Sequence, residues 1–243
     1  MGADQHFDWA RQAASTLQWW HDAGVDVLVD EAPRDWLARP APKPDVASPV
    51  ADAPVATAWP DTVEGFVAWR IDDAAPDHAA GAMTAPIISS HAQVMILVDM
   101  PEADDAANGA LVGGPAGRLL DRMLAAIDLD RSGVHLIPLC AARPVSGRIA
   151  QEIEPMLGRI ARHFMHLLHP QIVLTLGTAA SRAIATTDDM GGRMGLRIVN
   201  HEDADWRIIA SYHPRFLLER PAAKAEAWKH LQMVRNMLKQ GNE

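Results

Sequence analysis

The 243-residue sequence contains a single cysteine, Cys140, and this scarcity excludes several kinds of site. One thiol cannot form an intrachain disulfide, and it cannot supply the several thiolates of an iron-sulfur cluster or a cysteine-rich zinc site. Cys140 could itself be a nucleophile, but no neighbouring sequence marks it as one, and free cysteines are usually small buried core residues. The sequence therefore favours a structural thiol.

Long apolar runs and an excess of positive charge are also missing. No run approaches the roughly 20 apolar residues of a membrane span, and the N-terminus lacks the basic-then-apolar order of a secretory signal. A cytoplasmic protein is expected. The formal net charge of -9 argues against a strongly basic, nonspecific nucleic-acid binder but leaves room for a local basic patch. Arginines gather in two stretches, at Arg143, Arg148, Arg159 and Arg162 and at Arg193, Arg197, Arg207, Arg215 and Arg220.

The sequence divides into three parts. Residues 1–38 are predicted to be a helical extension, because apolar side chains recur at helical spacing over residues 7–23. Residues 39–60 contain six prolines, which neither a helix nor a central strand accommodates, and we interpret them as an extended linker. Residues 61–243 are predicted to be an α/β domain.

In this third part, apolar strands alternate with amphipathic helices. Asp61 is predicted to cap a first helix at residues 62–71, with Glu64 at its third position. Strands are predicted at 94–98, 134–139, 172–176 and 207–211, and further helices at 115–127, 149–168, 178–185 and 221–238. Strands that are apolar throughout and separated by helices indicate a three-layer sandwich with a central, mainly parallel four-stranded sheet.

The carboxyl edge of this sheet, where the parallel strands end, is the expected ligand site. Asp99 follows the first predicted strand and His213 follows the fourth. A carboxylate and an imidazole there could act as a charge stabiliser or base and as an electrophilic hydrogen-bond donor. Alternatively, Asp99 caps a turn and His213 is a packed loop histidine, and residue types alone favour this alternative.

Four segments agree in order and spacing with a known family. They are VGGPAGRLLDRML at residues 112–124, Arg143-Pro144, HPQIVLTLGTAASRAI from residue 169 and SYHPRFLLERPAAKAEAWKHLQ from residue 211. Together they resemble the uracil-DNA glycosylase superfamily, especially its family-four branch, over residues 90–238. The resemblance implies a DNA-repair hydrolase that cleaves the bond between a base and deoxyribose after the nucleotide is flipped out of the duplex.

The resemblance also implies roles for individual residues. Asp99 would position water and stabilise the sugar cation, and His213 would donate a hydrogen bond to the base oxygen where negative charge develops. Phe216 or Leu217 would insert into the duplex as an apolar wedge. The implied base pocket consists of Met100, Pro101, Leu111 and Pro138, and the implied DNA contacts are Arg143, Arg215, Phe216 and Leu217.

Several positions depart from the family pattern. Leu111 stands where the family has an aromatic residue that stacks on uracil, and Pro138 stands where an asparagine reads the pyrimidine edge. The carboxylates of Glu102, Asp104 and Asp105 could bind a metal or read an exocyclic amine, although a solvated acidic loop is favoured.

Cys140 alone cannot hold the four-iron cluster of the family-four enzymes, so packing must replace the structural role of that cluster. The tryptophans Trp9, Trp19, Trp20 and Trp36 could cover the exposed flank of the core or bind a partner, and the cover is favoured. His163, His166 and His169 could suggest a metal site, but histidines near a helix C-terminus are favoured by the helix dipole alone.

The leading expectation is a divergent, monofunctional DNA glycosylase that acts on uracil or another deaminated or damaged base. It is expected to be a monomer, to bind DNA, and to need no metal or other cofactor. One alternative is a catalytically inactive protein of the same fold that binds DNA or a repair protein. Another is a nucleotide-processing enzyme, which no phosphate-binding loop supports.

Overall fold

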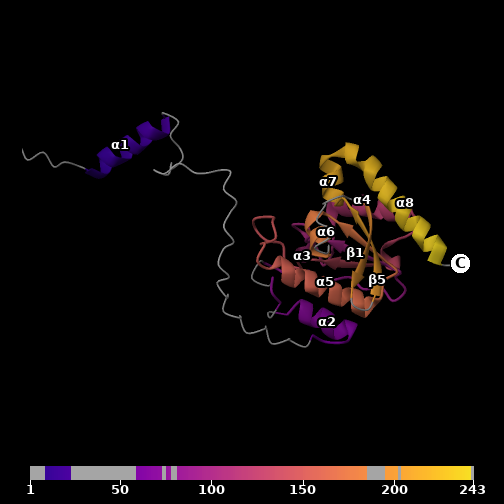
Figure 1. Ribbon diagram of the computed structural model, residues 1–243. Helices are drawn as coiled ribbons and strands as arrows, with labels where there is room; N and C mark the ends of the chain where they lie inside the picture. The colour runs from indigo at the N-terminus through magenta and orange to yellow at the C-terminus, as the bar shows by residue number, and fades with distance from the viewer. Residues whose placement is uncertain are drawn as a thin grey trace, which may run out of the picture. The chain divides into compact units, whose positions relative to one another are not determined.

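The computed structural model describes residues 9–22, 59–72, 75–77, 81–184, 195–201 and 204–241 (Figure 1). They belong to two compact units, Met1–Thr57 and Ala58–Glu243. The first unit contains helix α1 (Trp9–Asp22), which confirms the helix expected near the N-terminus. Most of the predicted linker lies outside the described residues. No helix in the described ranges is long and apolar enough to cross a membrane.

The second unit is built around a five-stranded sheet in the order β2-β1-β3-β5-β4. Its strands are β1 (Val94–Val98), β2 (Val134–Pro138), β3 (Ile172–Leu176), β4 (Gly195–His201) and β5 (Ala204–Ser211). The four predicted strands run parallel, which confirms the expected fold class. β4 was not predicted. It pairs antiparallel with β5 at the edge of the sheet, where the uniformly apolar pattern of a central strand is not required.

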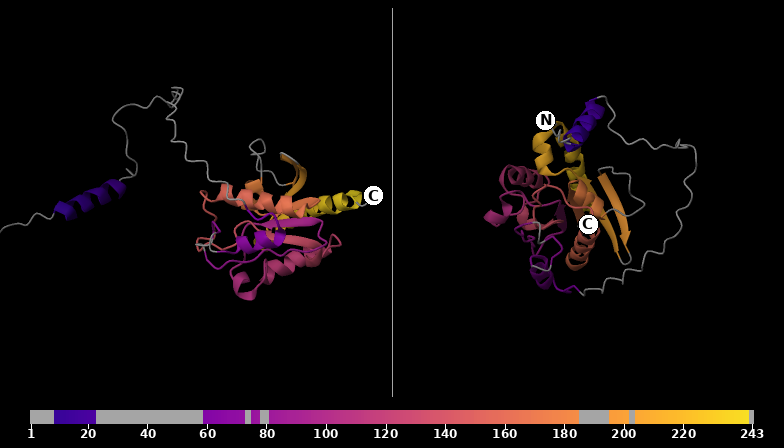
Figure 2. Two further views of the ribbon diagram at one scale, coloured as in Figure 1. Left: turned by 90° about the horizontal axis from the view of Figure 1, so that it is seen from below. Right: turned by 90° about the vertical axis from the view of Figure 1, so that its left-hand side faces the viewer.

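Helices cover both faces of the sheet (Figure 2). They are α2 (Val63–Arg70), α3 (Asp105–Asn108), α4 (Gly114–Ala125), α5 (Glu154–Leu168), α6 (Thr178–Ile184), α7 (Pro214–Glu219) and α8 (Lys224–Gly241). Side chains of α2, α5 and α6 pack on one face, and side chains of α4, α7 and α8 pack on the other. The second unit is therefore the three-layer sandwich that the sequence predicts.

The side chains of β1 show how both faces become apolar. Val94, Ile96 and Val98 join the core beneath α4 and α8, whereas Met95 and Leu97 join the core beneath α5. All five are buried, as expected for a parallel strand that helices cover on both sides. This packing fixes the position of the end of β1 between the two helical layers.

Two helix starts differ from the predicted ones for local reasons. Thr62, and not Asp61, caps α2, because its side chain accepts the N–H of Gly65 at 3.2 Å. α5 begins at Glu154, later than predicted, with Pro155 in its first turn. A proline fits the first turn, where its missing N–H has no partner, but it would disrupt the interior of a longer helix.

An aromatic cluster joins α2 to α5. The ring of Phe66 is fully buried, stacks on Trp69 at 5.2 Å, and meets His163 and Phe164 edge-on at 4.3 and 4.6 Å. Trp59 packs against Phe66 at 5.7 Å. These rings close one flank of the second unit with residues of that unit itself.

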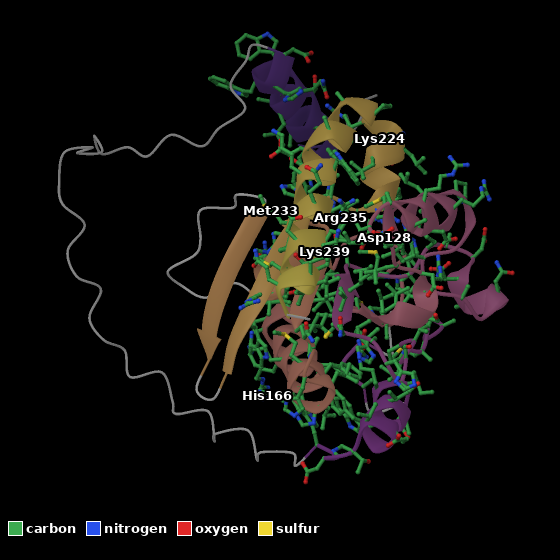
Figure 3. All side chains as sticks on the ribbon, turned by 90° about the vertical axis from the view of Figure 1, so that its right-hand side faces the viewer. Asp128, His166, Lys224, Met233, Arg235 and Lys239 are labelled. Carbon is green, nitrogen blue, oxygen red and sulfur yellow. The ribbon has the colours of Figure 1, made fainter. Side chains whose placement is uncertain are left out.

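His163 and His166 lie on α5, and His169 follows its last residue. The Nε2 atom of His163 lies 3.0 Å from the carbonyl oxygen of Pro60, and the ring of His166 meets Trp206 edge-on at 4.8 Å. Figure 3 labels His166 on α5. His169 ends the helix in a left-handed conformation, with φ 44°. His163 and His166 therefore serve in packing between neighbouring elements.

The N-terminal tryptophans lie in the other unit. On α1, Trp9 and Trp19 are 76% and 63% exposed, and the rings of Trp19 and Trp20 are in edge contact at 5.3 Å. Trp36 lies outside the described residues. That these tryptophans cover the core of the second unit stays a prediction.

A buried ion pair fixes the chain that follows β2. The guanidinium of Arg70 donates to both carboxylate oxygens of Asp77, at 2.6 and 2.7 Å, and neither side chain is accessible to solvent. Arg70 also donates to the carbonyl oxygen of Leu139 at 3.0 Å, and Asp77 accepts the N–H of Ala141 at 2.5 Å. The pair thus holds residues 139–141 in place at the carboxyl edge.

Candidate active site

Asp99 follows β1, and its carboxylate turns toward α6. Its Oδ1 accepts the N–H of Ala180 at 2.6 Å, one of the amides that lack an intrahelical partner in the first turn of α6. A Cβ atom at Gly177, where φ is 117°, would collide with the Asp99 carboxylate. Burial raises the pKa of Asp99, although the Ala180 amide opposes the shift. The carboxylate is therefore held close to the end of β3 by a glycine and a helix start.

His213 follows β5 and is 5% exposed. Its Nδ1 accepts the N–H of Arg215 at 3.2 Å, which places the ring proton on Nε2. Nε2 is buried and has no hydrogen-bond partner among the described residues. Burial, and then the positive charges of Arg215 and Arg143, lower the pKa of His213 to about 3. At neutral pH the ring is therefore uncharged and presents an unused N–H donor.

Glu102 connects the two halves of the site. Its Oε2 pairs with Nη1 of Arg215 at 2.9 Å, and its Oε1 lies 3.9 Å from Nδ1 of His213. Oε1 is buried and, within the described part of the chain, accepts no hydrogen bond. The loop after β1 and the start of α7 are thus joined by an ion pair that residue spacing did not reveal.

Asp105 is buried, contrary to the expectation from the sequence. It was expected in a solvated acidic loop, but it is 1% exposed and accepts the N–H groups of Glu102, Val112 and Gly113, each at 2.7 Å. Val112 has a φ of 53°, a strained conformation for a branched residue. The solvated-loop prediction is therefore wrong for Asp105, although it describes the exposed Asp104. Asp105 ties the loop after β1 to the start of α4.

The four predicted pocket residues are all buried. Met100 is 5% exposed in the core beneath α5, whereas Leu111 is fully buried in the core beneath α4. Pro101 is buried, and Pro138 pairs with Val98 at the end of β2. Leu111 offers no surface to a base in this conformation. Met100 and Pro101 follow Asp99 directly in the loop after β1, and their part in a base pocket stays a prediction.

The predicted DNA contacts separate into exposed and buried residues. Arg143 is half-buried and donates to the carbonyl oxygen of Pro101 at 2.8 Å, so it supports the loop after β1. Phe216 is 39% exposed and stacks on Tyr212 at 5.3 Å. Leu217 is 1% exposed, because adjacent helical residues point in different directions, so its side chain is not open to DNA in this conformation. Phe216 is the remaining candidate for the wedge.

Cys140 lies beside the buried ion pair. It is fully buried, and its thiol donates to the carbonyl oxygen of Ala142 at 3.0 Å. Burial, and then the negative charge of Asp77, raise the pKa of Cys140 to about 12. The thiol is protonated at neutral pH, which supports the structural interpretation over the nucleophile.

Comparison with known proteins agrees with this architecture. The family model described as the Uracil DNA glycosylase superfamily matches residues 85–232, which include all the elements that position Asp99 and His213. The chain belongs to the uracil-DNA glycosylase superfamily. It is thus a DNA glycosylase-like protein.

Two relatives place it more closely. The chain is 28% identical to the Type-4 uracil-DNA glycosylase of Archaeoglobus fulgidus over 143 residues, which are 56% of this chain and 71% of the relative. It is 24% identical to the Type-4 uracil-DNA glycosylase of Pyrobaculum aerophilum over 151 residues, or 58% and 75% of the two chains. The family-four relationship that the motifs predicted is confirmed.

Proposed function

We propose that this protein is a monofunctional DNA glycosylase that hydrolyses the N-glycosidic bond of uracil or of another deaminated or damaged base. The observation that carries the proposal is the buried Nε2–H of His213, which has no acceptor among the described residues. Leaving such a donor unpaired costs about 1–3 kcal/mol, so a ligand oxygen at this point is favoured. The names of both relatives support a base in DNA as the source of that oxygen.

His213 suits the charge that develops on a departing base. As the glycosidic bond breaks, the base gains negative charge, and a hydrogen bond from Nε2 strengthens with that charge. The pKa near 3 means that the imidazole starts neutral and acts as a hydrogen-bond donor, without an imidazolium proton to transfer. Because Nδ1 is occupied by the Arg215 amide, the ring cannot turn its donor elsewhere without losing that bond.

Asp99 suits the opposite charge, on the sugar. The backbone amides at the start of α6 hold its carboxylate in place, Ala180 at 2.6 Å among them, and the negative charge would position the attacking water or stabilise the sugar cation. The end of β1 supplies the carboxylate, and the first turn of α6 orients it. Together Asp99 and His213 would stabilise both ends of the breaking bond.

The expected substrates share a carbonyl group. Uracil, hypoxanthine and xanthine each present a carbonyl oxygen where deamination has replaced an amine, and a neutral N–H donor distinguishes this acceptor from an amino group. Pro138 offers no side-chain amide that could read the rest of a pyrimidine edge. We therefore propose selectivity for deaminated bases as a class, broader than for uracil alone.

An inactive DNA-binding or repair-partner protein is the second candidate. It is favoured by Glu102, whose carboxylate lies 3.9 Å from the His213 ring and would oppose a second negative charge nearby. The ion pair between Glu102 and Arg215 partly neutralises this negative charge. We therefore favour the enzyme over the inactive binder.

Excision from oligonucleotides that contain uracil, hypoxanthine or xanthine tests the proposal. Single-turnover rates should fall about 10- to 1,000-fold in His213→Ala and in Asp99→Ala, the scale of losing one group that stabilises developing charge. His91→Ala, at an exposed turn, is the matched control and should keep the wild-type rate. Since the pKa of His213 is about 3, its contribution should stay constant between about pH 5 and 8.

A negative cleavage assay would decide against the enzyme, and DNA binding would then separate the alternatives. Absence of cleavage on every substrate at high enzyme concentration would eliminate it. Salt-dependent DNA binding without cleavage would identify the inactive binder, and failure to bind DNA at all would point to a protein partner.

A further inference from the structure

A surface cavity of about 440 Å³ lies between α5 and α6, which are neighbours in Figure 1. Its lining includes Glu154, Met156, Arg159 and Arg162 from α5 and Arg182 and Ala183 from α6. Three of these side chains are arginines and one is acidic. The cavity therefore concentrates positive charge in a chain whose formal net charge is -9.

The three arginines have unequal partners. Arg182 donates from Nε to both carboxylate oxygens of Glu154, at 3.1 and 3.2 Å, so this pair is compensated. Arg162 is half-buried and donates to the carbonyl oxygen of Ala183 at 3.1 Å, whereas Arg159 is exposed and donates to the sulfur of Met156 at 3.2 Å. Among the described residues, neither Arg159 nor Arg162 has an acid within ion-pair distance.

The two uncompensated guanidinium groups act on each other. Burial, and then the positive charge of Arg159, lower the pKa of Arg162. Two like charges that share a partly desolvated cavity repel each other, and a bound anion would remove that cost. Guanidinium groups bind phosphate oxygens through paired N–H donors, so phosphate is the anion that this geometry suits.

Helix α6 extends from the carboxyl edge of the sheet, beside Asp99, to the cavity. This helix begins directly after β3, where Ala180 binds the carboxylate of Asp99, and Arg182 follows two residues later. Burial raises the pKa of Asp99, and the charge of Arg182 is one of the groups that oppose this rise. A DNA strand with a base beside Asp99 and His213 would have its phosphates on the surface around the start of α6.

We propose that the α5–α6 cavity binds a backbone phosphate of the DNA strand whose base enters the active site. The assignment rests on the proposed glycosylase function for the identity of the strand. Arg159 and Arg162 would supply the donors, and the neighbouring Glu154 would limit the affinity by its negative charge.

Fluorescence anisotropy with a labelled, uracil-containing duplex tests this over a range of salt concentrations. Arg159→Gln should weaken binding about five- to ten-fold at ~0.1 M salt and reduce the slope of log K against log salt by about one, the loss of one phosphate contact. Glu154→Gln should bind at least as tightly as wild type. The control is Arg235→Gln on α8, on the opposite face of the sheet (Figure 3), which should change neither quantity.

Excision separates this proposal from the catalytic one. Arg159→Gln should lose affinity and salt slope, whereas His213→Ala should bind DNA with the wild-type affinity and salt slope and lose cleavage. Wild-type affinity and slope in Arg159→Gln would overturn the phosphate site and leave the glycosylase intact. If wild type binds no DNA, both proposals are wrong.

A free phosphorylated ligand is the remaining source of the same chemistry. Thermal unfolding with added inorganic phosphate addresses it. Stabilisation of wild type by phosphate that Arg159→Gln abolishes, together with unchanged DNA binding in that variant, would assign the cavity to a free ligand and overturn the DNA assignment.

Discussion

Replacing Asp77 by asparagine should destabilise the second unit strongly. The side chains of Arg70 and Asp77 are both inaccessible, and two hydrogen bonds join them. Asp77→Asn leaves the Arg70 charge buried without its counter-charge, and removing one partner of a buried pair costs about 3–5 kcal/mol. The amide also weakens the bond that Asp77 accepts from Ala141. Against a typical domain stability of roughly 5–15 kcal/mol, this is a large fraction.

Urea unfolding followed by tryptophan fluorescence measures the loss. If the free energy of unfolding falls by about 2–3 kcal/mol per molar urea, the urea concentration at the unfolding midpoint should fall by roughly 1–2 M. Asp121→Asn is the control, because its pair with Arg131 is partly exposed and should contribute no more than about 1 kcal/mol. The double variant Arg70→Met/Asp77→Leu should recover much of the loss, since no charge is left unpaired.

The same pair predicts how stability depends on pH. Burial alone would raise the pKa of Asp77, but the hydrogen bond and charge of Arg70 outweigh it, and the pKa is lowered. A carboxyl whose folded pKa is depressed contributes its full stability above the unfolded pKa, near 4, and loses it as pH falls through the folded value. The difference between wild type and Asp77→Asn should therefore shrink below about pH 4. If the unfolding free energies of wild type and Asp77→Asn differ by less than about 1 kcal/mol at pH 7, with the same dependence on urea, the buried pair does not stabilise the fold as argued.

Two further predictions concern the residues around the site. Asp105→Ala removes the acceptor of three backbone N–H groups, so the free energy of unfolding in urea should fall by about 2–4 kcal/mol. Excision should also become slower, because Asp105 positions the loop after β1. Full excision activity in this variant would contradict that role. Leu217→Ala should lower the free energy of unfolding by about 2–5 kcal/mol, because it empties a core position. Phe216→Ala should leave the unfolding midpoint nearly unchanged and weaken DNA binding. The reverse pattern would show that Leu217 is the wedge.

The regular elements of the second unit could be predicted because their signals are local. The strands β1 and β3 coincide with their predicted ranges, since five consecutive apolar residues suffice to identify a strand buried on both faces. The edge strand β4 was missed because it lacks that pattern. The short helices α3 and α7 were missed for a related reason: neither is long enough to show a helical period.

The candidate site could be predicted only in part. Asp99 and His213 were selected by a topological rule, the meeting of parallel strands at their carboxyl ends, and by a family resemblance. The pairing of Glu102 with Arg215, and the three backbone hydrogen bonds of Asp105, had no signal in residue spacing. Each depends on how the loop after β1 folds back on α7 and α4.

The sequence by itself thus determined the layers of the fold, the family, and the two residues that carry the proposed chemistry. These follow from local hydrophobic patterns and from motifs that are contiguous along the chain. Only the tertiary structure decided that His213 is neutral with a free donor, that Leu217 is buried, and that Arg159 and Arg162 share a cavity. Protonation, exposure and charge compensation depend on desolvation and on neighbours distant in sequence, and those are set only when the chain has folded.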